Sequence, residues 1–159
     1  MPDITDILDR VKPREVRVPV CLAGDLAGEA DQLQAELEHA ADGWQPTSMG
    51  DVDPRVALTQ RLEEVREEMR QQSVEFRLVA IGHTAYSNLI AEHPAAGEDP
   101  TDPYDPATFL PALLAKSCAD PVMSLPQAVK LLELLNDGQA QALFAGALTV
   151  NEEPSPLPF

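Results

Sequence analysis

The residues of this chain that could do chemistry are three histidines, two cysteines and a short run of aspartates. His83 and His93 are ten positions apart, whereas two metal ligands on one helix face stand three or four positions apart. His39 stands alone beside Glu38. These spacings favour histidines that help a helix begin or lie on the surface, and we expect no metal site.

The cysteines and aspartates also lack the spacing of a reactive site. Cys21 and Cys118 are far apart in the sequence, which favours reduced, unbonded thiols, and Cys118 follows an apolar stripe typical of a packed thiol. Asp99, Asp102 and Asp105 step by three but lack the glycine turn and closing glutamate of a calcium loop, so a solvated linker is expected. The chain has no GxSxG, phosphate loop, GxGxxG or CxxC, and we predict no catalytic residue and no cofactor.

Composition limits the partners. The 159 residues carry a formal net charge of −16, which repels nucleic acid and anionic membranes but tolerates a basic protein partner. Hydrophobic residues make up 44% and aromatic residues only 4%, so we expect a folded core of Leu, Val and Ala, which favours helices. No stretch approaches the ~20 apolar residues of a membrane helix, and no cationic start precedes an apolar run. The expected location is the cytoplasm.

The elements of the first half follow from two periodicities. Two stripes step by four and three, as on one seam of a helix: Leu26, Ala30, Leu33, Leu37 and Ala40, then Leu58, Leu62, Val65 and Met69. Residues 15–22 and 74–80 alternate as half-buried strands do. The order predicts an antiparallel helical hairpin, 25–41 against 54–72, bracketed by a two-stranded pair. Pro19 lacks a backbone donor, which places its strand at a sheet edge.

Shorter helices are predicted in the rest of the chain, at 3–11, 84–93, 106–118, 125–136 and 138–150. The predicted fold class is therefore mainly α with a minor β element, in which a bundle of short helices follows the hairpin. The predicted organisation has a strand–hairpin–strand domain at 1–94, an acidic proline-rich connector at 95–106, a helical subdomain at 107–151 and a flexible tail at 152–159.

Several runs of residues resemble one protein family. These runs are Val74–Leu78, Tyr86–Pro94, Phe109–Ala115 with Cys118, and Asp137–Ala140 continuing through Leu143-Phe144 to Asn151, with Arg17–Leu22 and Gly24-Asp25-Leu26 fitting the N-terminal part. Together they resemble the tail assembly chaperones of long-tailed, siphovirus-like bacteriophages of GC-rich hosts. The resemblance covers most of residues 14–151, and none of its motifs is catalytic.

The resemblance implies a function without catalysis. Such proteins act in the host cytoplasm, coat the helical tape measure protein and help recruit tail tube subunits during tail morphogenesis. Homo-oligomers are plausible because coating a long helix needs many copies. Two other classes stay open: a virion structural protein for head–tail joining or tail completion, and an acidic regulator or nucleic-acid mimic.

A chaperone of this kind needs an apolar groove for a partner helix. The three C-terminal helices are leucine-rich, and each of their apolar residues is either core or groove. The candidate partner-binding residues are Leu110, Leu114, Leu131, Leu135 and Phe144.

Overall fold

The computed structural model describes residues 1–98 and 100–158. Asp99, in the predicted connector, and Phe159, in the predicted tail, therefore lie outside the described residues. The described chain is mainly helical with a small antiparallel sheet, which confirms the predicted fold class. It divides into two compact units: unit 1 comprises Met1–Val18 and Glu75–Phe159, and unit 2 comprises Pro19–Val74.

This division differs from the predicted domain boundaries at 94 and 107. The helices predicted before and after the connector both belong to unit 1. The same unit includes the part of the first strand up to Val18 and the part of the second strand from Glu75. The reason is packing: α7 (Asp137–Glu152) lies so close to the sheet that a Cβ on Gly146 would stand 2.7 Å from Val18 and 2.9 Å from Leu78. The predicted boundaries followed neighbouring residues in the sequence. Contacts between distant residues instead join the segments before and after the connector in one core.

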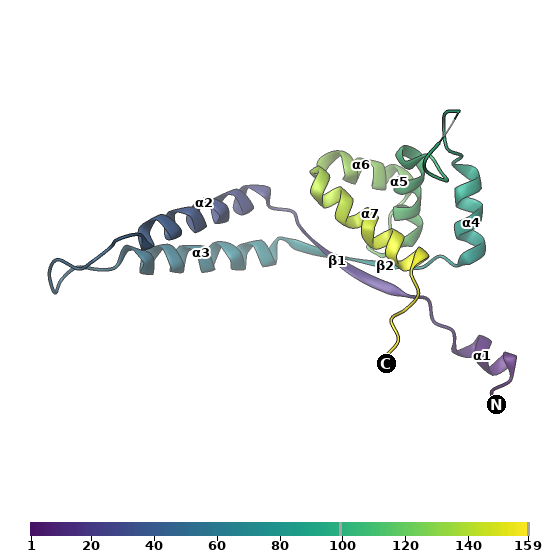
Figure 1. Cartoon of the computed structure of the whole chain (residues 1–159), viewed down its shortest axis with the longest axis horizontal. Helices are drawn as coiled ribbons and strands as arrows, with labels where there is room; N and C mark the ends of the chain where they lie inside the picture. Colours follow the sequence, from purple (N-terminus) through teal and green to yellow (C-terminus); the bar gives the residue numbers. More distant parts are fainter. Residues whose placement is uncertain (99, 159) are drawn as a thin grey trace. The chain divides into compact units, whose positions relative to one another are not determined.

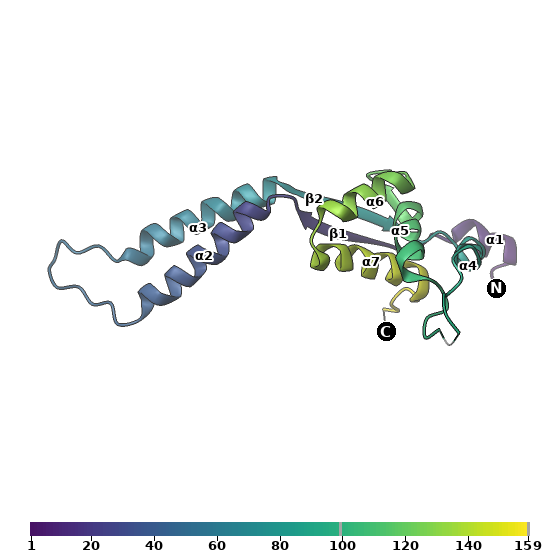
Figure 2. The same cartoon turned by 90° about the horizontal axis from the view of Figure 1, so that it is seen from above.

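Unit 2 is the predicted helical hairpin. α2 (Gly24–Ala41) and α3 (Pro54–Gln71) lie side by side and run in opposite directions (Figures 1 and 2). Asp53 caps α3 by accepting a 2.9 Å bond from Arg55 N, with Pro54 at the first helical position. α2 begins instead after Ala23, and no side chain caps it.

Three strands form the sheet in the order β1-β2-β3. β1 (Glu15–Cys21) lies at one edge, as Pro19 predicted. Its neighbour β2 (Ser73–Val79) runs antiparallel to it, with Ala80 N donating to Arg14 O and Leu22 N to Gln72 O, both at 2.9 Å. The predicted pairing of the two strands is therefore confirmed.

The third strand was not predicted. β3 (Cys118–Asp120) pairs antiparallel with β2, so that Leu78 faces Cys118 and Arg77 faces Asp120. The helix predicted at 106–118 ends one residue earlier, because α5 comprises Pro106–Ser117. A strand of three residues is too short to display a period of two, and only its long-range partner defines it.

Five helices complete unit 1: α1 (Ile4–Arg10), α4 (His83–Glu92), α5, α6 (Leu125–Leu134) and α7. Capping residues set four of the starts, because Asp3 caps α1 and Asp105 caps α5, while Ser124 and Asn136 each form a capping box before α6 and α7. α4 begins after Gly82, whose φ of 93° suits glycine, one residue before the predicted start at 84.

The core of unit 1 lies where α5 packs against α6, α7, α4 and β3. Its fully buried large side chains are Leu78, Leu89, Phe109, Leu113, Leu114 and Leu143. These residues are leucines around one phenylalanine, as the low aromatic content implied. This packed core holds the helices of unit 1 against one another.

Candidate functional site

One of the five predicted partner-binding residues belongs to the core. Leu114 is 0% exposed on α5, so it packs inside unit 1 and the prediction of a partner-facing role for it was wrong. In the sequence, an apolar residue of the core and an apolar residue of a binding groove follow the same helical spacing. Only the burial of the side chain in the structure distinguishes them. Leu110, Leu131, Leu135 and Phe144 are half-buried, so part of each side chain stays accessible.

The most exposed apolar side chains of this region were not among the predicted residues. Leu134 on α6 is 75% exposed and Val122, just before that helix, is 83% exposed. Leu125 and Val129 are 46% and 41% exposed. A helix of ten residues with leucine or valine on most sides cannot bury them all against one neighbour. The four leucines and one valine within 129–135, which point to more than one side of a helix, were the signal that could have indicated this surface.

These apolar residues lie in the least charged part of the chain. Between residues 106 and 151 there are three acidic side chains (Asp120, Glu133 and Asp137) and two lysines (Lys116 and Lys130), in a protein whose formal charge is −16. Charge repulsion is therefore weak here, and burying this surface against a partner desolvates few ions.

Hydrogen bonds of the Asn151 side chain connect α7 to α5 and to the segment after β2. Asn151 Nδ2 donates to Ser117 Oγ at 2.9 Å, and its Oδ1 accepts from Ile81 N at 3.0 Å. Ser117 is 1% exposed, so the bond satisfies a buried hydroxyl. One amide side chain thus links α5, α7 and the segment after β2.

Aromatic packing accounts for one of the histidines. Phe109, 0% exposed, has Tyr104 stacked on it at 3.9 Å, and meets Tyr86 and His93 edge to face at 5.9 and 6.2 Å. His93 Nδ1 lies 3.0 Å from Thr108 Oγ1. The Tyr86 hydroxyl donates to Glu152, and burial, followed by this bond, raises the pKa of the tyrosine. These contacts are those of a packed cluster.

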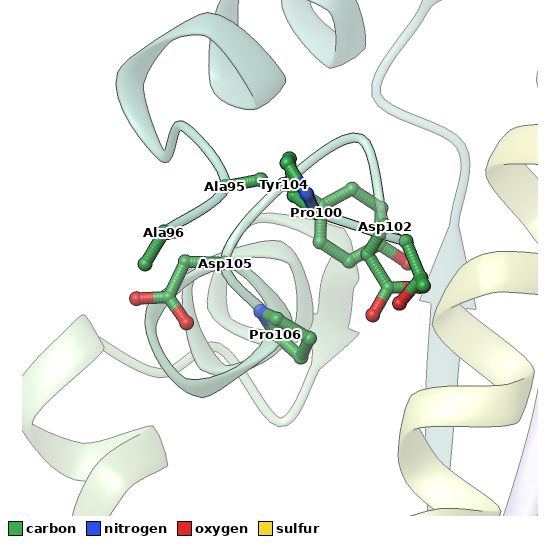
Figure 3. Close-up of a pocket in the computed structure, with 8 residues that line it drawn as sticks. Ala95, Ala96, Pro100, Asp102, Tyr104, Asp105 and Pro106 are labelled. Carbon is green, nitrogen blue, oxygen red and sulfur yellow. The ribbon is translucent and has the colours of Figure 1, made fainter. Parts of the chain in front are cut away.

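A cavity of about 310 Å³ lies beside this cluster, in the predicted connector (Figure 3). Its polar side chains have structural tasks: Asp105 accepts from Ala107 N at 3.2 Å and from Thr108 Oγ1 at 3.3 Å, and the Tyr104 ring stacks on Phe109. The remaining walls are mostly alanine and proline. Among the described residues that line it, the cavity has two carboxylates and the hydroxyls of Thr101 and Tyr104, but no histidine, cysteine, lysine or arginine.

The two thiols are held separately. Cys118 is a buried free thiol whose Sγ lies 3.1 Å from Pro121 O, and burial raises its pKa. A raised pKa keeps the thiol protonated and lowers its reactivity. Cys21 Sγ donates weakly to the carbonyl oxygens of Ala23 and Met69, at 3.8 and 3.9 Å. Cys118 is therefore not bonded to Cys21.

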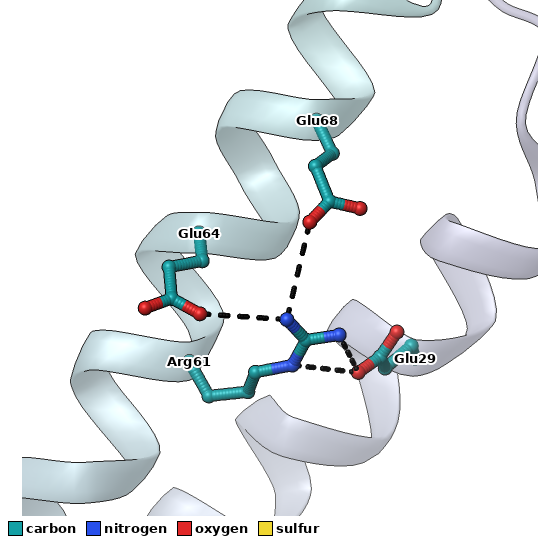
Figure 4. A network of polar contacts seen from close by, with 4 residues as sticks. All are labelled: Glu29, Arg61, Glu64 and Glu68. Atoms are coloured by element: carbon teal, nitrogen blue, oxygen red, sulfur yellow. Dashed lines mark hydrogen bonds and ion pairs between the residues drawn. The ribbon is translucent and has the colours of Figure 1, made fainter.

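Unit 2 presents a different surface, built from ion pairs. Arg61 of α3 binds Glu29 of α2 through Nε at 2.9 Å and Nη2 at 2.7 Å, and Glu64 and Glu68 of its own helix lie 3.4 and 3.9 Å from Nη1 (Figure 4). The hydrogen bond to Glu29 is the main reason that the pKa of Arg61 is raised. Because all four side chains are exposed, this network adds little stability and mainly sets helix register.

The loop between the two helices is organised by one carboxylate. Asp51 accepts from Thr47 N and Oγ1, both at 2.6 Å, and from Ser48 N at 2.9 Å and Oγ at 3.0 Å. These bonds lower the pKa of Asp51 to about 2. The loop presents Met49 and Val52, 107% and 77% exposed, to solvent.

No three His, Cys, Asp or Glu side chains of residues 1–98 and 100–158 gather as a metal ion would require. Within those ranges, no helix combines the length and the apolar character needed to cross a bilayer.

Comparison of the chain with protein-family models, with curated proteins and with solved structures gives no match.

Proposed function

We propose that this chain is a tail assembly chaperone of a long-tailed bacteriophage. It binds the tape measure protein and tail tube subunits in the host cytoplasm during tail morphogenesis, and it catalyses no reaction. The observation that carries the proposal is the nearly uncharged, partly apolar surface of α5, α6 and α7 on a strongly acidic protein. The resemblance of the sequence runs within 14–151 to this family gives the class of partner.

The binding surface consists of the accessible candidates, Leu110, Leu131, Leu135 and Phe144, together with Leu134. Leu131 and Leu134 share one side of α6, because residues three apart on a helix are neighbours, and Leu135 is the residue that ends this helix. An amphipathic partner helix lays its own apolar side chains on such a surface. The acidic remainder of the chain keeps the complex in solution.

The test is co-expression with the tape measure protein of the same genome, followed by affinity capture on a tagged chain. Leu134→Glu places a charge in the contact, and the loss of one buried leucine, about 1.5–3 kcal/mol, lowers capture roughly 10- to 100-fold. Leu157→Glu is the matched control, because Leu157 is 70% exposed in the tail and lies outside the proposed surface.

Two results decide against the proposal. If the wild-type chain captures no tape measure protein, the chaperone function is abandoned. If the chain is found in purified phage particles in a fixed ratio to the tube protein, it is a structural component instead.

A further inference from the structure

Two backbone hydrogen bonds at the ends of β1 define which of its backbone groups face β2. Arg14 O accepts from Ala80 N and Leu22 N donates to Gln72 O, both at 2.9 Å. The segments 14–22 and 72–80 are equally long, so no bulge shifts the register between these bonds. In an antiparallel pair, successive residues alternate between bonding the neighbouring strand and pointing away from it. The even positions of β1 therefore bond β2, and the odd positions direct their backbone groups to the outer edge of the sheet.

Pro19 is one of these odd positions, and it has no N–H group. Its missing donor therefore faces the outer edge and removes no bond to β2. Pro13 stands two positions before β1 begins, so a strand that followed this edge further would find no donor there either. Between the two prolines, the outer edge offers the N–H groups of Glu15 and Arg17.

The two edges of the described sheet differ in length. β1 has seven residues, whereas β3, at the opposite edge, has three. A long edge strand is a template on which another chain can add a strand, and a very short one is not. β1 is therefore the edge at which the sheets of two copies of this chain could join.

The side chains at the outer edge carry alternating charges on one face of the sheet. Glu15 accepts from Arg77 Nη1 at 3.3 Å, and Arg17 Nη1 donates to Glu75 at 2.9 Å. All four of these side chains are partly or well exposed to solvent. An added strand would therefore lay its side chains beside a carboxylate and a guanidinium.

This charge pattern is complementary to itself. When two β1 strands run antiparallel with Glu15 opposite Arg17 of the other copy, each carboxylate faces a guanidinium, which favours the pairing. The same register sets Pro13 opposite Pro19, and neither residue has an N–H to donate. Both ends of such a ladder therefore lack their backbone bonds, and only its centre can form them.

We propose that Pro13 and Pro19 block the outer edge of β1 and keep copies of this chain from joining their sheets. The charges of Glu15 and Arg17 favour the contact, and the two prolines prevent it by withholding backbone donors. Proline on an edge strand is a known protection against such pairing. The proposal is independent of the proposed chaperone function and concerns no other surface of the chain.

The first test is native-state hydrogen exchange of the wild-type chain, measured by NMR. The amides of Val16, Val18 and Val20 should exchange at least roughly 100-fold more slowly than those of Glu15 and Arg17, because the even positions bond β2 and the odd positions face solvent. Equal protection of the two sets would mean that the outer edge is already bonded, and would overturn the proposal.

The second test replaces both prolines. Pro13→Thr combined with Pro19→Thr restores the two donors and introduces a residue that favours strands. Sedimentation equilibrium and light scattering from roughly 5 to 500 μM cover the range in which small interfaces associate. The mass should rise with concentration to twice that of the wild type measured beside it. Protection of the Val18 amide shows that the variant keeps its strand, and Pro19→Thr alone is measured if it does not.

Two further variants are the controls. Pro46→Thr combined with Pro156→Thr makes the same chemical change at two exposed prolines of the hairpin loop and the tail, and should keep the wild-type mass. Adding Arg17→Glu to the two edge substitutions sets Glu opposite Glu between the copies, and should return the mass to that of the wild type. The proposal is overturned if the folded edge variant associates no more than the wild type or the loop-and-tail control. Association that survives Arg17→Glu overturns it as well.

Discussion

Unit 1 and unit 2 differ in how many apolar side chains they bury. Among the described core residues only Val20, Leu62 and Val65 belong to unit 2, while the others lie in unit 1. α2 has no buried residue at all, and its apolar stripe is half-buried. A hairpin of two helices covers each seam from one side only, whereas α5 is surrounded by neighbours on several sides.

The surfaces of the two units also differ, in their density of charged side chains. Unit 2 keeps its helices in register with exposed pairs such as Arg61–Glu29, and its surface is densely charged. Helices α5 to α7 of unit 1 are nearly neutral and expose leucine and valine. A deep core allows unit 1 to expose apolar side chains, because its own stability does not depend on them. A shallow hairpin needs its few apolar side chains for itself.

The largest effect should follow from removing the centre of unit 1. Phe109→Ala should lower the free energy of unfolding by about 3–5 kcal/mol, since the ring is fully buried and touches Tyr86, Tyr104 and His93. Chemical denaturation with native-state hydrogen exchange is the measurement, with exchange expected to rise first in α5 and α7. A loss of less than about 1 kcal/mol would show that unit 1 is not closely packed around this ring.

The hairpin should respond unequally on its two helices. Leu62→Ala on α3 should cost about 2–3 kcal/mol, because Leu62 is 3% exposed. Leu33→Ala on α2 should cost only about 1 kcal/mol, because this side chain is half-buried and already partly in water. Equal losses in denaturant melts of the two variants would mean that α2 is covered as deeply as α3, and the contrast between the units would weaken.

Two glycine-to-alanine changes should have opposite signs. Gly146→Ala on α7 should cost about 1–3 kcal/mol, because the new methyl group meets Val18 at 2.7 Å and Leu78 at 2.9 Å. Gly28→Ala on α2 should stabilise by about 0.5–1 kcal/mol, because nothing lies within 4 Å of the new atom and alanine favours helix. Thermal melts of both variants test this, and a gain in stability for Gly146→Ala would disprove the close approach of α7 to the sheet.

The smallest effect concerns pH and stays local to the loop of unit 2. The Asp51 pKa of about 2 lies below its ordinary 3.8. The ionised group therefore stabilises the loop above pH 3.8, and this contribution is lost as the pH falls through about 2. An NMR titration of the Asp51 carboxyl carbon should give a midpoint near 2. Asp51→Asn should loosen residues 47–51 at neutral pH, and a midpoint near 3.8 would rule out the four hydrogen bonds.

Local patterns determined most of the secondary structure. The heptad stripes of 26–40 and 58–69, the alternation around Val18 and Leu78, and the caps Asp53, Ser124 and Asn136 act over a few residues. Their period and chemistry are therefore readable from the sequence alone. The edge position of β1 was likewise readable from Pro19, because a missing donor excludes a central strand.

Tertiary structure alone decided which apolar side chains are core and which are surface. Leu114 and Leu134 look alike in a leucine-rich stretch, yet one is 0% and the other 75% exposed, because α5 is enclosed by neighbours while α6 packs mainly on α5. β3 and the division into units also depend on partners some forty or more residues away. Burial is a property of what surrounds a residue, and the sequence specifies only its affinity for water.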